Sequence, residues 1–157
     1  MTSPITQRIF SFISGLWVGS FIFVGFLVVP ILFSSLGDRQ VAGMVAANLF
    51  KTTAYVGVAL STILMFMSNY FVRHRIYQYR KTRWILLAML ACFITAAFIL
   101  IPWMDSLRDQ ALYFNLSVRE TSHAELFTRL HGISSAIFLI QSILGLILVW
   151  SSTKNAG

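Results

Sequence analysis

Four long apolar runs dominate the sequence, and polar or charged stretches separate them. The runs cover approximately residues 9–33, 52–71, 84–104 and 131–150, and none of them contains Asp, Glu, Lys or Arg. A helix needs about 20 predominantly apolar residues to cross the hydrocarbon core of a bilayer, and each run supplies that length. The pattern therefore predicts an all-α, polytopic membrane protein built as a bundle of four transmembrane helices.

The first outer segment, residues 34–51, has a helical pattern of its own. Asp38 is suited to the N-cap position of a helix, because its carboxylate can accept hydrogen bonds from the first free amides. Behind it, apolar residues recur at helical spacing from Val41 to Leu49. Two structures fit this pattern: an amphipathic helix lying on the bundle or the membrane surface, or a helical extension of the run 52–71.

The second outer segment, residues 105–130, is the longest polar stretch. Its first half keeps helical spacing, so the third helix is expected to continue beyond the membrane. Ser122 and Glu125 have the spacing of a capping box ahead of an apolar run. The last helix is therefore expected to begin near His123.

Composition agrees with a single membrane domain spanning residues 1–157. Apolar residues make up 57% of the chain and charged residues 11%, whereas soluble domains are about a quarter charged. No linker or internal repeat divides the chain. Its one cysteine excludes an internal disulfide framework.

The net charge of +7 comes from one side of the predicted bundle. The short loop 72–83 carries five basic residues and no acid: Arg73, Arg75, Arg80, Lys81 and Arg83. Four spans place this loop and both termini on one face, and the positive-inside rule makes that face cytoplasmic. The sequence thus predicts a multi-pass protein of the inner (plasma) membrane with cytoplasmic N- and C-termini. The loop could also attract anionic lipids, whereas nucleic-acid binding is not expected.

Small residues predict where helices approach closely. Ser11, Gly15 and Gly19 recur every four residues in the first run, which is typical of tight helix contacts in membranes.

The stretch from Phe127 to Ser135 is the strongest candidate for a site. On a helical wheel that places His131 at 0°, Ser135 lies at about +40° and Ser134 at about −60°. His131 is therefore expected to head the packing face and, with Ser134 and Ser135, to contact a small ligand at the outer mouth of the bundle. The alternative is a purely structural histidine that is hydrogen-bonded in the same place.

Other polar groups near this mouth have weaker functional interpretations. His131, Met104 and His123 could contribute to a soft metal site, and His131 with Met104 could ligate a haem iron. The spacing does not favour either, and no cofactor is predicted. Glu125 precedes Arg129 by four residues, which predicts a surface ion pair, with lipid phosphate as an alternative partner for the arginine.

The sequence contains no nucleophile–base pair, phosphate-binding loop or paired carboxylates with catalytic spacing. It also lacks charged residues and central glycine or proline breaks inside the apolar runs, which disfavours an ion pathway. We therefore expect a non-enzymatic protein that binds a small ligand or lipid, or serves as an accessory subunit. The alternatives are a metal- or haem-linked redox or resistance protein using His131 and Met104, and a small-solute transporter. The pattern specifies no oligomeric state.

Several short motifs resemble one known family. They are Gly15-Leu-Trp-Val-Gly19, Pro30-Ile-Leu-Phe33, the segment from Ala42 to Phe50 and, above all, the segment from Phe127 to Ser135. The chain is similar to the domain of unknown function 4149 family, bacterial relatives of transmembrane protein 205. The resemblance implies a four-helix integral membrane protein and no established chemistry. Relatives often carry an asparagine in the last helix where this chain has Phe138, so a polar site deeper in the bundle is not predicted.

Overall fold

A computed structural model describes residues 4–114 and 116–156, and within these residues the chain is helical, with no strand. The elements, in chain order, are α1 (Pro4–Phe23), η1 (Val24–Val28), α2 (Val29–Ser35), α3 (Arg39–Arg73), α4 (Tyr79–Thr95), η2 (Ala96–Leu100), α5 (Ile101–Tyr113), η3 (Val118–Glu120) and α6 (Ala124–Ala156). They form four rods, because α1, η1 and α2 are continuous, as are α4, η2 and α5. All four rods are long and apolar enough to cross a membrane, so the predicted fold is confirmed.

Two π-helical turns interrupt the first and third rods. Val29 donates its N–H to the carbonyl of Val24, and Ile101 donates to the carbonyl of Ala96, five residues back in each case. Each donor immediately precedes a proline in the sequence. Because a proline lacks an N–H and crowds the carbonyl four residues before it, the widened turn relieves the conflict at each site. The apolar pattern of the two runs does not by itself reveal these widened turns.

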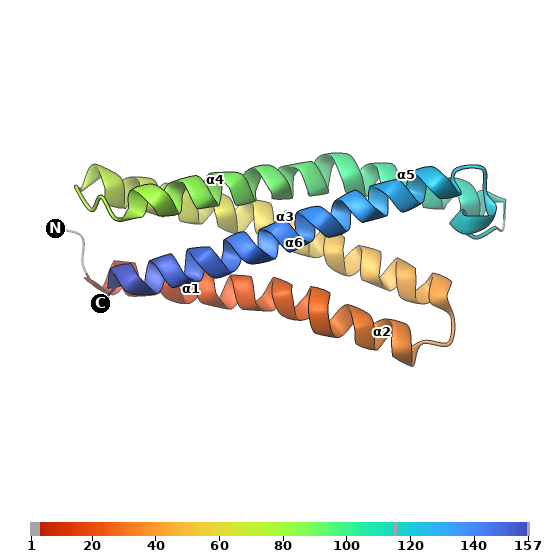
Figure 1. The fold of residues 1–157 in the computed structure, drawn as a ribbon, viewed down its shortest axis with the longest axis horizontal. Helices are drawn as coiled ribbons and strands as arrows, with labels where there is room; N and C mark the ends of the chain where they lie inside the picture. Colours follow the sequence, from red (N-terminus) through yellow and green to blue (C-terminus); the bar gives the residue numbers. More distant parts are fainter. Residues whose placement is uncertain (1–3, 115, 157) are drawn as a thin grey trace.

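The two ends of the bundle differ in what they expose. At one end, which we call the basic end, α1 begins, α6 finishes and the turn between α3 and α4 lies (Figure 1). At the other, which we call the loop end, α2 connects to α3 and α5 connects through η3 to α6 (Figure 1). The placement of both termini and the basic turn at one end is what an even number of spans requires.

The segment after Asp38 belongs to the second rod. Asp38 is the N-cap residue of α3, and its Oδ1 accepts hydrogen bonds from the amides of Gln40 (2.7 Å) and Val41 (3.4 Å). From Arg39 the helix runs without a break to Arg73. The predicted N-cap is thus confirmed, and of the two structures that fit this segment the helical extension forms.

The predicted capping box at Ser122 and Glu125 is wrong. The structure forms one earlier, at η3, where the Ser117 amide donates to Glu120 Oε2 at 2.9 Å. Glu125 instead accepts a hydrogen bond from Arg129 one turn further along α6, which draws its carboxylate away from the helix N-terminus. The last helix begins at Ala124, within one residue of the predicted start.

The tightly packed core lies toward the basic end. Phe10, Phe71 and Tyr79 are fully buried, and their rings are 4.6–5.9 Å apart from centre to centre. Small hydroxyl side chains are also fully or almost fully buried in the bundle and let the helices approach one another: Ser14, Ser61, Ser68, Thr82 and Ser152. Most of these hydroxyls are satisfied locally, as Ser14 is by the carbonyl of Phe10 at 2.8 Å. This half of the bundle is therefore closely packed.

Close helix contacts involve different glycines from those predicted. A Cβ built on Gly15 or Gly19 meets no atom of another helix within 4 Å, so these residues do not mediate packing inside the described chain. A Cβ on Gly25 would collide with the ring of Phe138, and one on Gly57 with the ring of Phe93. The prediction for the first run was wrong at Gly15 and Gly19, whereas Ser11 does contact α6 by donating its hydroxyl to the Ser152 carbonyl at 3.0 Å.

Candidate functional site

An open cavity of about 820 Å³ occupies the loop half of the bundle. All four rods contribute to its wall. The first rod supplies Gly25, Phe26, Val29 and Phe33; α3 supplies residues between Arg39 and Ala54; the third rod supplies residues between Phe93 and Leu112; and α6 supplies residues between Phe127 and Gln141. Leu116, Ser117 and Val118 contribute from the α5–α6 connection.

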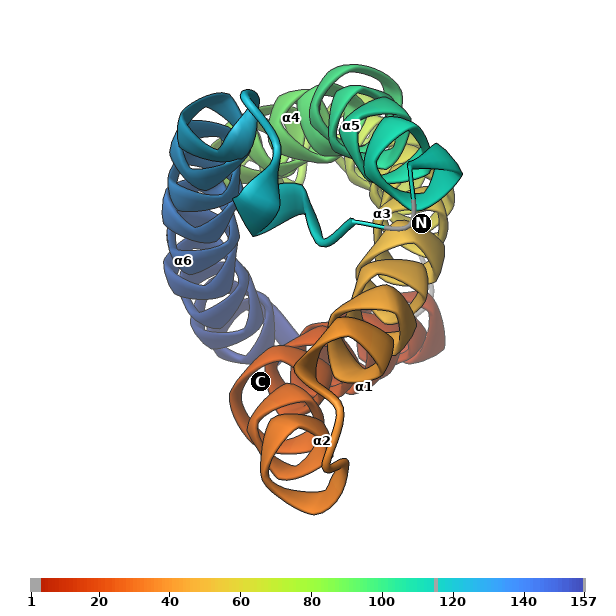
Figure 2. The same cartoon turned by 90° about the vertical axis from the view of Figure 1, so that its right-hand side faces the viewer.

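The helices change partners along the bundle, and this opens the cavity. Near the basic end α6 lies beside α1 and α3 lies beside α4, whereas near the loop end α6 lies beside α5 and α3 beside α2 (Figure 1). A view onto the loop end shows the rods as a ring, with α2 leaning outward and the α5–α6 connection reaching across (Figure 2). Both π-helical turns contribute residues to the cavity wall, Gly25 from one and Ala96 from the other. Breaks at π-turns are frequent at functional sites.

Aromatic rings cluster around Phe138 in the deeper part of the cavity. The Phe138 ring lies 5.4–6.1 Å, centre to centre, from the rings of Phe21, Phe26 and Phe50. Gly25 is required opposite this ring, because any Cβ there would overlap it. Phe138 is thus the centre of an aromatic cluster formed by the first, second and fourth rods.

Gln141 is a buried polar group that lines the cavity. It is 3% exposed, and its side-chain Nε2 has no hydrogen-bond partner within the described part of the chain. Burying an amide without a partner costs about 1–3 kcal/mol, so an acceptor in the cavity would stabilise it. Trp17 Nε1 and Tyr79 Oη are also buried without partners, but neither residue lines the cavity.

A charged cluster lies on the cavity wall nearer the loop end. Asp105 joins α3 to α5: its Oδ2 is 3.0 Å from Lys51 Nζ and its Oδ1 is 2.8 Å from Arg108 Nη1. The Arg108 guanidinium lies over the Phe127 ring at 5.5 Å, which ties α5 to α6 as well. Arg39 and Gln40 line the same region. The cavity therefore has apolar walls and a polar, predominantly cationic rim.

The predicted ligand residues all line this cavity, but their orientation differs from the prediction. Only Ser134 is half-buried, and its hydroxyl is 3.6 Å from Met104 Sδ. On a wheel centred on Ser134, most buried residues of α6 lie within about 40°, and Ser142 lies at about 80°; His131 lies at about 60° and Ser135 at about 100° on that same side. His131 and Ser135 are exposed, so the expectation that His131 heads the packing face was wrong. A helical wheel of α6 alone does not tell which of its faces contacts the other helices. The structure shows that Leu130, rather than His131, is buried at this point of α6.

Two of the residues considered for a metal or haem, His131 and Met104, line the cavity. Within the described residues, no group of three or more His, Cys, Asp or Glu side chains is arranged to hold a metal ion. Met104 is 6% exposed and its sulfur is the acceptor for the Ser134 hydroxyl. His123 is exposed and is not part of the cavity wall, while the His131 ring stacks on Phe127 at 6.5 Å.

Glu125 and Arg129 lie on the outside of α6. Arg129 Nη2 is 2.7 Å from Glu125 Oε1, and the two side chains are 73% and 79% exposed. Neither lines the cavity. The geometry is that of a solvent- or headgroup-facing ion pair of small energetic value.

The five basic residues near the turn lie at three structural positions. Arg73 is the last residue of α3. Arg75 lies in the turn with φ = 65°, a left-handed conformation that is uncommon for residues other than glycine. Arg80, Lys81 and Arg83 lie in the first turns of α4. Arg83 alone is half-buried, and its Nη1 is 3.4 Å from Asn69 Oδ1.

Sequence reasoning missed the cluster at Asp105 and the buried Gln141. The (i, i+3) spacing of Asp105 and Arg108 was visible in the sequence, but their link to Lys51 joins positions 54 residues apart. Gln141 is the one amide within the run 131–150, a signal that could have identified it. A polar group in the middle of an apolar run is costly in a bilayer and therefore informative.

Comparison with known proteins identifies the family and nothing narrower. The chain matches no curated protein and no solved structure. The family model described as a domain of unknown function (DUF4149) matches residues 12–112, nearly two thirds of the chain, and this range covers three of the four rods. The stretch Phe127–Ser135 lies beyond the matched range. The protein, a four-helix membrane protein, therefore belongs to the DUF4149 family.

Proposed function

We propose that this protein binds an amphiphilic, lipid-like molecule in the cavity of its loop half, without catalysing a reaction on it. The observation that carries this proposal is the cavity itself, which combines apolar walls, a cationic rim and the unpartnered amide of Gln141. Ligand sites typically have volumes of about 300–1,000 Å³ with a few placed polar groups. The cavity of about 820 Å³ is within that range.

The walls favour a hydrocarbon or ring system as the body of the ligand. Phe33, Met44 and Leu139 line the cavity and are 43%, 42% and 52% exposed. Covering such surfaces gains about 25 cal/mol for each Å² of apolar area removed from water. At the deep end, Gln141 Nε2 would donate to an oxygen acceptor such as a carbonyl, ester or hydroxyl group of the ligand.

The rim favours an anionic or zwitterionic head group. Arg39 and Arg108 line the cavity together with one carboxylate, Asp105, which also pairs with Lys51, so the lining cations outnumber the lining acids by two to one. In this proposal His131, Ser134 and Ser135 add hydrogen-bonding groups on the facing wall of α6. Head-group recognition at the rim and acceptor recognition at Gln141 would together orient the molecule along the bundle.

The charge distribution supports an orientation for the site. The basic end of the described chain carries cations without acids, and the positive-inside rule makes that end cytoplasmic. The cavity would then open toward the outer face of an inner membrane and the outer leaflet. Accessibility of a C-terminal tag to an impermeant reagent tests this orientation: labelling in intact cells would reverse it.

Filling the cavity tests binding directly. Gly43 lines the cavity, and a Cβ built there meets nothing within 4 Å, so Gly43→Leu places a side chain in open space. Native mass spectrometry of protein released from lipid nanodiscs should show a bound amphiphile on the wild type and its loss from Gly43→Leu. Gln141→Leu, which removes the unpaired amide, should weaken retention of an ester-bearing amphiphile by about tenfold.

Gly15→Leu is the matched control for the cavity test. A Cβ on Gly15 also meets open space, but this position does not line the cavity. The fraction of Gly15→Leu protein that carries the bound amphiphile should equal the fraction for the wild type. A wild type without any adduct, or a Gly43→Leu variant that retains the adduct at the level of Gly15→Leu, would refute the proposal.

A further inference from the structure

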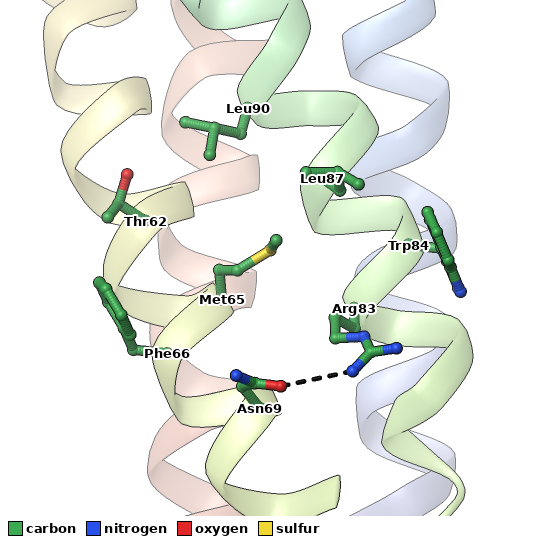
Figure 3. A pocket seen from close by; sticks show the side chains of 8 residues that line it. All are labelled: Thr62, Met65, Phe66, Asn69, Arg83, Trp84, Leu87 and Leu90. Carbon is green, nitrogen blue, oxygen red and sulfur yellow. Dashed lines mark hydrogen bonds between the residues drawn. The ribbon is translucent and has the colours of Figure 1, made fainter.

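A second hollow lies on the flank of the bundle near the basic end. This groove of about 460 Å³ runs between α3 and α4 and shares no lining residue with the cavity of the loop half. Figure 3 shows Asn69 and Arg83 at one end of it, joined by a hydrogen bond, and Leu90 at the other. Met65 lies between them (Figure 3). The groove thus has one polar end, nearest the turn, and an apolar body that follows the two helices.

Arg83 has a neutral partner at this polar end. Its Nη1 donates to Asn69 Oδ1 at 3.4 Å, a long hydrogen bond that leaves most of the guanidinium donors for other acceptors. No Asp or Glu occurs between residues 52 and 104, so neither helix of the groove supplies an acid beside it. All five acidic residues of the chain belong to the loop-end segments, at positions 38, 105, 109, 120 and 125. No Asp or Glu side chain is therefore available at this end of the bundle to pair with Arg83.

Exposed aromatic side chains flank the groove. Trp84 is 60% exposed and Phe66 is 72% exposed, and both line the groove. The Arg83 guanidinium lies 5.9 Å from the Trp84 ring centre. Tryptophan beside arginine is typical of the depth at which lipid head groups meet hydrocarbon. This depth places a phosphate group within reach of Arg83 and acyl chains beside Leu90.

We propose that the α3–α4 groove binds one anionic phospholipid from the leaflet at the basic end. Its phosphate pairs with Arg83 and accepts a hydrogen bond from the Asn69 amide, and one acyl chain lies along Met65 and Leu90. Charge complementarity selects the head group, because the positive end of the groove lacks any acid. The apolar body of the groove selects a lipid over free phosphate. This site is separate from the proposed outer cavity and does not depend on it.

Retention of phosphatidylglycerol in mixed nanodiscs tests the site. Wild-type protein released from phosphatidylcholine nanodiscs that contain phosphatidylglycerol should carry one phosphatidylglycerol molecule in native mass spectra. Arg83→Gln should lower its retention about fivefold, since a basic residue near an anionic surface contributes about that factor. Arg83→Lys, which keeps the charge, should recover most of it.

Arg80→Gln is the matched control, because it removes the same charge from the same helix start. Arg80 is exposed and does not line the groove. It should retain phosphatidylglycerol as the wild type does; an equal loss from both variants would show diffuse surface attraction and overturn the proposal. Leu90→Trp narrows the apolar body without changing any charge and should also reduce retention. A wild type without preference for phosphatidylglycerol would overturn the proposal too, whereas Gly43→Leu should leave this retention unchanged.

Discussion

The basic half and the loop half of the bundle are made of similar apolar helices, yet one is closed and the other hollow. In the basic half Phe10, Phe71 and Tyr79 are fully buried against one another. In the loop half Phe26 and Phe33 are 55% and 43% exposed and line a cavity. The comparison shows that hydrophobicity alone does not close a membrane bundle. Close packing requires small side chains where helices cross and bulky ones between them.

The two halves also distribute their charges differently. The loop half joins its helices through Asp105, which contacts both Lys51 and Arg108. The basic half has cations at its end and no acid to pair with them. Close packing therefore holds the basic half together, while in the loop half a smaller apolar cluster (Leu100, Met104, Leu107 and Leu130) and the ion pairs join helices around a space.

Removing a core ring should have the largest effect. Phe10→Ala deletes a fully buried ring that contacts Phe71 and Tyr79, and such truncations cost about 3–5 kcal/mol. Phe33→Ala deletes a ring of the same size from the cavity wall and should cost about 1 kcal/mol or less, because the site is already open. Reversible unfolding in mixed micelles measures both free energies. Equal losses from the two variants would remove the distinction between a closed and a hollow half.

The fold was readable from the sequence because membrane helices are specified by length and hydropathy. The four apolar runs located all four rods, and Asp38 located the start of α3. The widened turns before Pro30 and Pro102 were not predicted, although both prolines are visible in the sequence. A proline signals a local conflict, but whether the helix kinks, ends or widens depends on its neighbours.

The site was predicted less completely because it is formed by residues far apart in the chain. His131, Ser134 and Ser135 were located as cavity residues, but a helical wheel of one helix could not orient them. Gln141 was missed although it is the more deeply buried polar residue. The same limitation applies to Gly25, whose importance comes from the Phe138 ring on another rod. Pairwise contacts between rods cannot be derived from the periodicity of each one alone.

Breaking the ion pairs should have a smaller and salt-dependent effect. Asp105→Asn removes the common partner of two cations, and partly exposed pairs of this kind contribute about 0–1 kcal/mol. Raising the salt concentration should destabilise the wild type slightly and leave Asp105→Asn unchanged, because the Debye length shortens from about 10 Å at 0.1 M to 3 Å at 1 M. Spin-label distances between α3 and α5 at the loop end should widen in the variant. If labels between α3 and α4 at the basic end widen equally, the ion pairs do not act on the loop half specifically.

The smallest expected effect is a pH-dependent loosening of the α5–α6 connection. The Ser117 backbone amide and hydroxyl hydrogen-bond the Glu120 carboxylate and lower its pKa below the usual 4.5. A lowered pKa in the folded state means that the carboxylate stabilises the turn above about pH 4.5 and that this stabilisation is lost as pH falls through the lowered value. Hydrogen-exchange protection of residues 117–121, corrected for intrinsic rates, should fall on acidification in the wild type. Glu120→Gln, which cannot ionise, should show weaker protection at neutral pH and no further loss of protection on acidification.

Because this connection contributes Ser117 and Val118 to the cavity wall, acid should open the loop half while the closed half keeps its protection. A parallel loss at Tyr79 and Leu86 would instead mean that the two halves unfold together.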